Sequence, residues 1–299
     1  MNKHTEISGV SLKLSKFFEQ EGIKLPVRKL QCLSKQVIDS IRRIQYIKKM
    51  KERDLDDQRA DPRSELFDPL LGALCYMQSG HYDEACWLTF LAIHFGKNKL
   101  SGWAYAKAIY RGGENLWTWE NINNDKAGFL EWLSLNQGKI KDTGCFGNHR
   151  KYESLNAYKD RGTGAAVISY TDLIKSDHAQ FFMRGVEAAG DERGLAFDFL
   201  YKEIKSKVAT FGRMATFDYL CMIGKLGLAE VEPNKLYLSG STGPIDGARL
   251  LFGSRPVREL EEALQRLECG LALDFGMQVL EDAICNWQKS PARYVHFRG

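Results

Sequence analysis

The sequence has no pair of cysteines close enough to form a CxxC motif. Its seven cysteines are scattered between positions 32 and 285, so their spacing indicates neither a zinc ribbon, a disulfide framework nor an iron–sulfur cluster. No apolar run is long enough to span a bilayer, and residues 1–16 lack the apolar core of a signal peptide. These absences predict a cytoplasmic protein with free thiols, no membrane partner and no metal or other cofactor.

Strand signals and linkers are also missing. Alternating runs rich in Val, Ile and Thr are nearly absent, and neither a repeat period nor a Pro- or Ser-rich linker divides the chain. Apolar residues recur instead at steps of three and four, which predicts an all-α fold. Asp83 and Asp177 stand ahead of two such stretches and are predicted helix N-caps. With 299 residues and 44% hydrophobic content, the chain can form one large domain or two closely packed ones.

The net charge of +4 is too small to predict nucleic-acid binding by itself, but the basic residues are unevenly distributed. They crowd into residues 28–51, where apolar side chains are spaced as one stripe of a helix. We expect residues 1–60 to form an N-terminal extension built around this basic amphipathic helix. Its basic face is either an ordinary solvated surface or a contact for phosphates, and the sequence leaves both readings open.

A glycine-flanked turn between an apolar lead-in and a helical pattern is the most informative local feature. Glycines accept positive φ at little cost, so the turn Gly240-Ser241-Thr242-Gly243 can be sharp. It exposes backbone N–H groups at the start of the next helix, and such groups bind an anion. In a helix–hairpin–helix element that anion is a DNA backbone phosphate. The alternative is a glycine C-cap followed by Pro244 in the first helical turn.

Residues 136–152 show no strong period and are predicted to be a loop, and a loop this long inside a compact domain is often functional. Six chemically different polar groups follow one another at its end: Asn148, His149, Arg150, Lys151, Tyr152 and Glu153. Such density suits recognition of the polar edge of a nucleobase together with a grip on nearby phosphates. An ordinary polar surface turn is the alternative.

Arg213 and Asp218 lie five positions apart in a mostly apolar helical stretch. Because an unpaired buried charge is costly, these two side chains either form a structural ion pair or hold a polar ligand. The sequence does not decide between these alternatives.

A predicted helix near the C-terminus combines several carboxylates with apolar side chains. Glu281 shares one helix face with Cys285 and Gln288, and Asp282 lies on the adjacent face. Asp274 stands ahead of this helix. Half-buried carboxylates can have shifted pKa values, which makes them candidates for chemistry.

Taken in order, four segments resemble the α-glutamyl/putrescinyl thymine pyrophosphorylase family, a branch of the helix–hairpin–helix DNA glycosylase superfamily. The segments are residues 83–103, 146–155, 240–252 and 280–291. The resemblance covers residues 61–299 and implies an all-α, glycosylase-like domain over that range. It also implies action on hypermodified pyrimidines in double-stranded phage DNA, such as glucosylated 5-hydroxymethylcytosine.

The resemblance implies a catalytic carboxylate that stabilises the oxocarbenium charge on deoxyribose. The superfamily spacing from the hairpin falls on Glu261 and Glu262, within a charged helix that we expect to be exposed. We therefore predict that Glu281 and Asp282 are catalytic, with Asp274 close behind. Bifunctional relatives carry a lysine two residues after the second hairpin glycine, where this chain has Ile245, so we predict a monofunctional glycosylase.

Two further sets of residues complete the predicted site. The expected base pocket consists of Asn148, His149, Lys151, Tyr152, Glu153, Arg213, Asp218 and Trp287. The expected DNA backbone contacts are Gly240, Ser241, Thr242, Gly243, Arg249, Arg150 and Lys289.

Two branches of the family remain open at this point. One resembles phage enzymes that build hypermodified thymine from a pyrophosphate-activated base. The other resembles bacterial glycosylases that excise the modified base in antiviral defence. The chain shows no nucleotide P-loop and no second domain for coupling, which favours excision. A DNA-binding module without catalytic activity is the third alternative.

Overall fold

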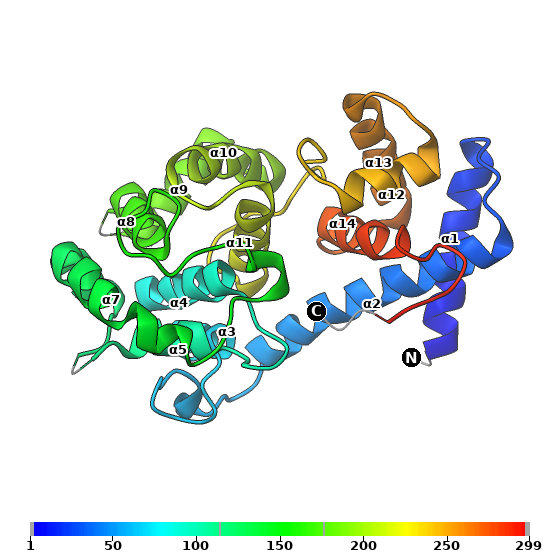
Figure 1. Cartoon of the computed structure of the whole chain (residues 1–299). Coiled ribbons are helices and arrows are strands. Elements are labelled where there is room, and N and C mark those ends of the chain that lie inside the picture. The colour runs from blue at the N-terminus through cyan, green and yellow to red at the C-terminus, as the bar shows by residue number, and fades with distance from the viewer. Residues whose placement is uncertain (1–2, 114, 176, 297–299) are drawn as a thin grey trace. The chain divides into compact units, whose positions relative to one another are not determined.

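The computed structural model describes residues 3–113, 115–175 and 177–296, and within them the chain is all-α, as predicted (Figure 1). These residues contain no strand, only two isolated bridges, Asn98–Gly102 and Ser154–Gly162. None of the described helices is both long and apolar enough to cross a membrane. The chain divides into two compact units: unit 1 comprises Met1–Lys49 and Glu232–Gly299, and unit 2 comprises Met50–Val231.

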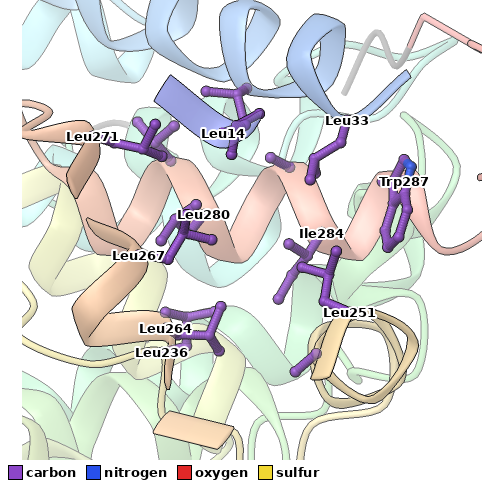
Figure 2. Close-up of a cluster of buried hydrophobic side chains, with 14 of the residues drawn as sticks. Leu14, Leu33, Leu236, Leu251, Leu264, Leu267, Leu271, Leu280, Ile284 and Trp287 are labelled. Carbon is purple, nitrogen blue, oxygen red and sulfur yellow. The ribbon is translucent and has the colours of Figure 1, made fainter. Parts of the chain in front are cut away.

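Unit 1 joins the two ends of the chain around one apolar core. Its helices are α1 (Lys3–Gln20), α2 (Val27–Lys51), α12 (Gly243–Phe252), α13 (Val257–Leu271) and α14 (Gly276–Trp287). Figure 2 shows α14 running through this core, with Leu280, Ile284 and Trp287 surrounded by leucines of the other helices. These three side chains are at most 1% exposed. Burying such large apolar groups supplies most of the stability of a helical unit.

The apolar stripe predicted for residues 28–51 faces this core. Leu33, Val37 and Ile44 are buried on α2, as expected for an amphipathic helix. The N-terminal helices are thus part of unit 1, with Leu14 of α1 in the same cluster. The predicted division of the chain into an extension of residues 1–60 and a domain of residues 61–299 stays a prediction.

Unit 2 is built around α4, a helix that is apolar on all sides. It contains η1 (Asp57–Arg59), α3 (Pro69–Gln78), α4 (Tyr82–Phe95), α5 (Ala104–Arg111), α6 (Trp119–Asn124), α7 (Lys126–Lys141), η2 (Asn148–Arg150), α8 (Thr163–Ile174), α9 (His178–Ala188), α10 (Arg193–Lys207) and α11 (Arg213–Leu226). A helix without a polar face has to be covered by others. Phe90 of α4 stacks on Trp87, Tyr170 and Phe211 with ring centroids 5.3, 4.0 and 5.1 Å away.

Two local predictions need correction. The expected loop over residues 136–152 begins later, because α7 continues to Lys141 and buries Ile140 in its last turn. Asp177 caps α9 as predicted, accepting the N–H of Gln180 at 2.9 Å. Asp83 is not the cap of α4, because this helix already begins at Tyr82. The Asp83 carboxylate instead accepts two hydrogen bonds from His178, one from the backbone N at 2.9 Å and one from Nδ1 at 2.6 Å.

Two fully buried histidines lie in the core of unit 2. Burial lowers the pKa of His178, although Asp83 opposes the shift. His94 has its Nε2 3.0 Å from the Thr163 hydroxyl, and burial, reinforced by the charge of Arg150, lowers its pKa from 6.5 to about 3. Both rings are therefore neutral at neutral pH.

The buried His94 makes stability depend on pH. Its pKa is lower in the folded state, so the unfolded chain takes up a proton first as the pH falls below 6.5. The free energy of unfolding should thus fall by about 1.4 kcal/mol per pH unit through this one group, at pH values between the two pKa values. His94→Gln should remove this contribution from the slope measured by urea unfolding at several pH values. An equal slope in the natural protein and in His94→Gln would contradict the assignment.

Candidate functional site

The predicted turn is present and opens α12. Gly240 has φ +77°, and the Ser241 N–H donates to the Leu238 carbonyl at 2.9 Å, which closes the turn. α12 then begins at Gly243, with Pro244 in its first turn. Thr242 occupies the N-cap position, but its side chain makes no capping hydrogen bond. The N–H groups of the first turn therefore keep their capacity to bind an anion.

The lead-in to this turn is irregular, with Tyr237 at φ +52°, and a carboxylate on α13 holds it. Glu261 accepts the backbone N–H groups of Leu236 at 2.9 Å and Leu238 at 2.6 Å. The expectation that Glu261 is exposed is therefore wrong: the side chain is half-buried. Its carboxylate supplies acceptors to backbone N–H groups that have no partner in a helix or sheet. Its neighbour Glu262 is exposed and pairs with Arg258 at 2.8 Å.

The turn lies directly against α14. A Cβ atom on Gly243 would come within 2.6 Å of the Cys285 sulfur, and one on Gly247 within 2.5 Å of the Ile284 carbonyl oxygen. Only residues without a side chain allow α12 to approach α14 this closely. The helix face that carries Cys285 and Gln288 therefore meets the start of α12, and Glu281 lies one turn earlier on the same face.

Asp282 is the centre of a hydrogen-bond network within unit 1. Its carboxylate accepts hydrogen bonds from Ser40 Oγ at 2.9 Å, Arg43 Nε at 3.0 Å and Asn286 Nδ2 at 3.1 Å, and it also pairs with the Arg43 Nη2 atom. Ser40 and Asn286 are buried, and the Asp282 side chain is 27% exposed. This arrangement ties α2 to α14 and occupies both carboxylate oxygens.

The other two predicted carboxylates have different surroundings. Asp274, just before α14, pairs with Lys48 of α2, and both side chains are well exposed. Glu281 is half-buried on the face of α14 that turns toward α12. The three carboxylates thus belong to one unit, which also carries the glycine turn.

Three more predicted residues lie in unit 1. Trp287 is buried in the core, where its Nε1–H is shared between the carbonyls of Lys29 and Pro291, both at 3.1 Å. A base cannot stack on a ring that is 1% exposed, so the structure gives Trp287 a packing role. Arg249 is exposed on α12, 3.8 Å from Asp246, and Lys289 is exposed beyond α14.

Arg150 has a structural position in unit 2, unlike the surface contact expected of it. It is 7% exposed, donates from Nε to the Ile93 carbonyl at 2.9 Å and pairs through Nη2 with Asp218 at 3.1 Å. Asp218 therefore forms an ion pair with Arg150. Arg213 is buried at the start of α11, with its guanidinium 5.2 Å from the ring centre of Phe217.

The remaining residues of the predicted base pocket lie on one surface segment. Asn148, His149, Lys151 and Tyr152 are exposed, and the Lys151 Nζ atom lies 5.1 Å from the ring centre of Tyr152. Glu153 is half-buried, and burial raises its pKa against the opposing charges of Arg150 and Arg161. Lys151 and Glu153 both line a pocket of about 690 Å³ that lies wholly within unit 2.

Most of the other pocket residues were not predicted from the sequence. Tyr105 comes from α5, Gln137 and Lys141 from the last turn of α7, and Asn156 from the segment after η2. The sequence offered two local signals for this pocket, the long loop predicted over residues 136–152 and the polar run at its end, whereas nothing in the helical pattern marked Tyr105. Among the described residues no group of three His, Cys, Asp or Glu side chains could hold a metal ion.

Comparison with known proteins identifies a family but no individual relative. The family model described as alpha-glutamyl/putrescinyl thymine pyrophosphorylase clade 3 matches residues 28–299. No curated protein and no solved structure matches the chain.

The two ion pairs of the predicted catalytic carboxylates should differ in stability. Asp282→Ala leaves Arg43 and Ser40 without their acceptor, and should lower the free energy of unfolding by about 1–2 kcal/mol, a range discounted for the partial exposure of Arg43. Asp274→Ala removes an exposed pair and should cost less than about 0.5 kcal/mol. Urea unfolding of both variants tests this, and equal costs would contradict an anchoring role for Asp282.

Proposed function

This chain belongs to the alpha-glutamyl/putrescinyl thymine pyrophosphorylase family, and on that premise we propose that it is a DNA glycosylase. It excises a bulky hypermodified pyrimidine, such as glucosylated 5-hydroxymethylcytosine, from double-stranded phage DNA and leaves an abasic site. Removing such bases from invading DNA serves antiviral defence. The observation that carries the proposal is the glycine turn of α12 packed against the carboxylate-bearing helix α14.

The turn supports binding of the DNA backbone. The first turn of α12 has no side-chain cap, and Gly240 provides the positive φ that a sharp hairpin needs. Backbone N–H groups at a helix start bind a phosphate without regard to base sequence. Arg249 on α12 and Lys289 beyond α14 add positive charge within the same unit. This part of the site accounts for affinity and not for base choice.

A carboxylate beside the bound backbone can support the bond cleavage. In the reaction the bond between C1′ and the base nitrogen breaks, and the base leaves with the electron pair. Water adds to C1′, giving one proton to the carboxylate, and the departing base takes up a proton. A negative carboxylate stabilises the oxocarbenium charge that develops on the sugar.

Glu281 is the leading candidate for this carboxylate because it shares the α14 face that meets the glycine turn. Asp282, which pairs with Arg43, and Asp274, which pairs with Lys48, are the other two candidates. Position 245, where a bifunctional glycosylase carries a lysine, is isoleucine here. We therefore expect base release without strand cleavage.

The exposed segment of residues 148–153 is proposed to determine which base is excised. Its polar side chains can hydrogen-bond an adduct on the pyrimidine, with Lys151 and Glu153 at the mouth of the unit 2 pocket. A polar site discriminates in the bond-breaking step against substrates that lack the adduct, because its own groups are then left unpaired in the transition state. Unmodified thymine and cytosine should therefore be spared.

The family description favours a second candidate function, because it names a thymine pyrophosphorylase. In this reading the protein is a transferase that builds hypermodified thymine in DNA from a pyrophosphate-activated base. The glycine turn would serve the same purpose, and the carboxylate would activate an amine in place of water.

One experiment separates these functions. Purified protein is incubated, without metal or nucleotide, with phage DNA that carries glucosylated 5-hydroxymethylcytosine and with unmodified DNA. We expect mass spectrometry to detect the free modified base, and alkali to break the modified DNA alone. The strand should remain intact before alkali, and borohydride should trap no covalent adduct.

The other outcomes identify the alternatives. A transferase leaves the strand stable to alkali and changes the mass of the base when its co-substrate is supplied. A DNA-binding module without activity only shifts the DNA, with an affinity that falls steeply as the salt concentration rises. Within the active protein, Glu281→Gln should reduce base release at least about 100-fold while DNA binding persists. Full activity in the Glu281, Asp282 and Asp274 variants would remove α14 from the mechanism.

The role of the turn can be tested by blocking its anion site. Thr242→Asp supplies the missing N-cap, so it should not destabilise α12, but its negative charge competes with phosphate for the same N–H groups. Binding of modified and plain DNA should weaken to a similar extent. His81→Asp adds the same charge at the uncapped start of α4 and serves as the matched control. A Thr242→Asp protein that loses only the preference for modified DNA would assign the turn to the base pocket.

A further inference from the structure

The pocket in unit 2 has a preformed apolar wall. The rings of Tyr105 and Phe146 meet edge to face with centroids 5.1 Å apart. The backbone of Phe146 is fixed by a hydrogen bond from Asn98 Nδ2 to its carbonyl at 3.0 Å, and the next N–H, of Gly147, donates to the Phe95 carbonyl at 2.8 Å. A pocket of about 690 Å³ with such a wall has the size and rigidity of a small-molecule site.

Two amide side chains, Asn156 and Gln137, are among the residues that line this pocket. Asn156 Oδ1 accepts the N–H groups of Tyr158 and Lys159 at 2.9 and 2.8 Å, so its Nδ2 is the group that can donate to a ligand. Gln137 donates from Nε2 to the Ser134 carbonyl at 3.2 Å, so its Oε1 is the group that can accept. Within the described part of the chain, neither Asn156 Nδ2 nor Gln137 Oε1 has another hydrogen-bond partner. A donor and an acceptor held in this way suit the polar edge of a planar ring.

The charges at the pocket mouth favour an anion. Lys141 and Lys151 line the pocket, both are exposed, and neither forms an ion pair among the described residues. Glu153 carries the single carboxyl among the lining residues, and burial raises its pKa, which disfavours its negative form. The balance of charge is positive where the pocket opens to solvent.

We propose that this pocket binds a nucleoside monophosphate. The base lies against the wall of Tyr105 and Phe146, its polar edge meets the two amides, and the phosphate pairs with Lys141 and Lys151. The ligand chemistry has two possible sources, a free nucleotide or one nucleotide of a DNA strand. This assignment deepens the proposed function, which already gives Lys151 and Glu153 of this pocket a part in base choice, but its test measures binding without base release.

Gly138 offers a variant that fills the pocket without disturbing the fold. It lies in the last turn of α7 and lines the pocket, and a Cβ added there would meet no atom within 4 Å. Leucine also has a higher helix propensity than glycine, so Gly138→Leu should fold at least as well as the natural chain. Gly9→Leu is the matched control, since Gly9 is exposed within α1 and equally free of neighbours.

Isothermal titration of the full chain with thymidine monophosphate tests the proposal. We expect saturable binding, with thymidine and inorganic phosphate each at least about tenfold weaker, because each lacks one half of the ligand. Gly138→Leu should weaken thymidine monophosphate binding at least about tenfold, and Gly9→Leu should not change it. Lys141→Gln should weaken binding several-fold, because a positive charge near the phosphate is lost. Glu153→Gln should strengthen binding, because a negative charge near the phosphate is lost.

The competing outcomes are distinct. No binding of thymidine monophosphate at millimolar concentration, or equal binding by Gly138→Leu, overturns the proposal. If a short single-stranded oligonucleotide displaces the bound nucleotide, the pocket takes a nucleotide of DNA. If saturating oligonucleotide leaves nucleotide binding unchanged, the pocket serves the free nucleotide. Failure of base release on modified DNA alters neither reading, so the two proposals fail separately.

Discussion

The close approach of α12 to α14 is the constraint on which the candidate DNA site depends. Gly243 and Gly247 lie one helical turn apart, and a side chain at either position would collide with Cys285 or Ile284. Because the two helix backbones nearly touch, the start of α12 is fixed relative to the α14 face that carries Glu281. A phosphate held at the turn and a carboxylate on α14 thus keep a constant spacing, which electrostatic stabilisation of a transition state requires.

The basic helix α2 forms ion pairs within unit 1, which neither interpretation of the sequence included. Its cations were expected either to face solvent or to face DNA phosphates. Arg43 and Lys48 instead pair with Asp282 and Asp274, the carboxylates that looked like candidates for catalysis. Charge on α2 therefore neutralises charge at α14 inside unit 1. Part of the negative charge that Asp282 and Asp274 bring to unit 1 is thus compensated within the unit itself.

In unit 2 the buried arginine Arg150 performs a comparable anchoring task. It joins the end of α4, through the Ile93 carbonyl, to Asp218 of α11. The residues on either side of it are thereby held in place, with Phe146 turned to the pocket and Lys151 and Glu153 at its edge. The polar run of residues 148–153 thus has two functions. Arg150 is structural, whereas Lys151 and Glu153 line the pocket.

The sequence by itself determined the fold class, the glycine turn, the apolar stripe of α2 and the family, because each of these is a pattern among residues close together in the chain. Helical periodicity repeats every few residues, and a turn needs only its own glycines. It could not identify the partner of a charge. Arg43 and Asp282 lie 239 positions apart, and a carboxylate on an amphipathic helix has the same local pattern whether it is solvated, paired or catalytic. The sequence marked the stretch of residues 136–153 but not the pocket in unit 2, since its walls are brought together from α5, α7 and the segment around η2. Only the tertiary structure decided that Glu261 supports the backbone, Arg150 and Trp287 are buried, and Asp282 anchors α2, because burial and ion pairing arise from contacts between segments that folding brings together.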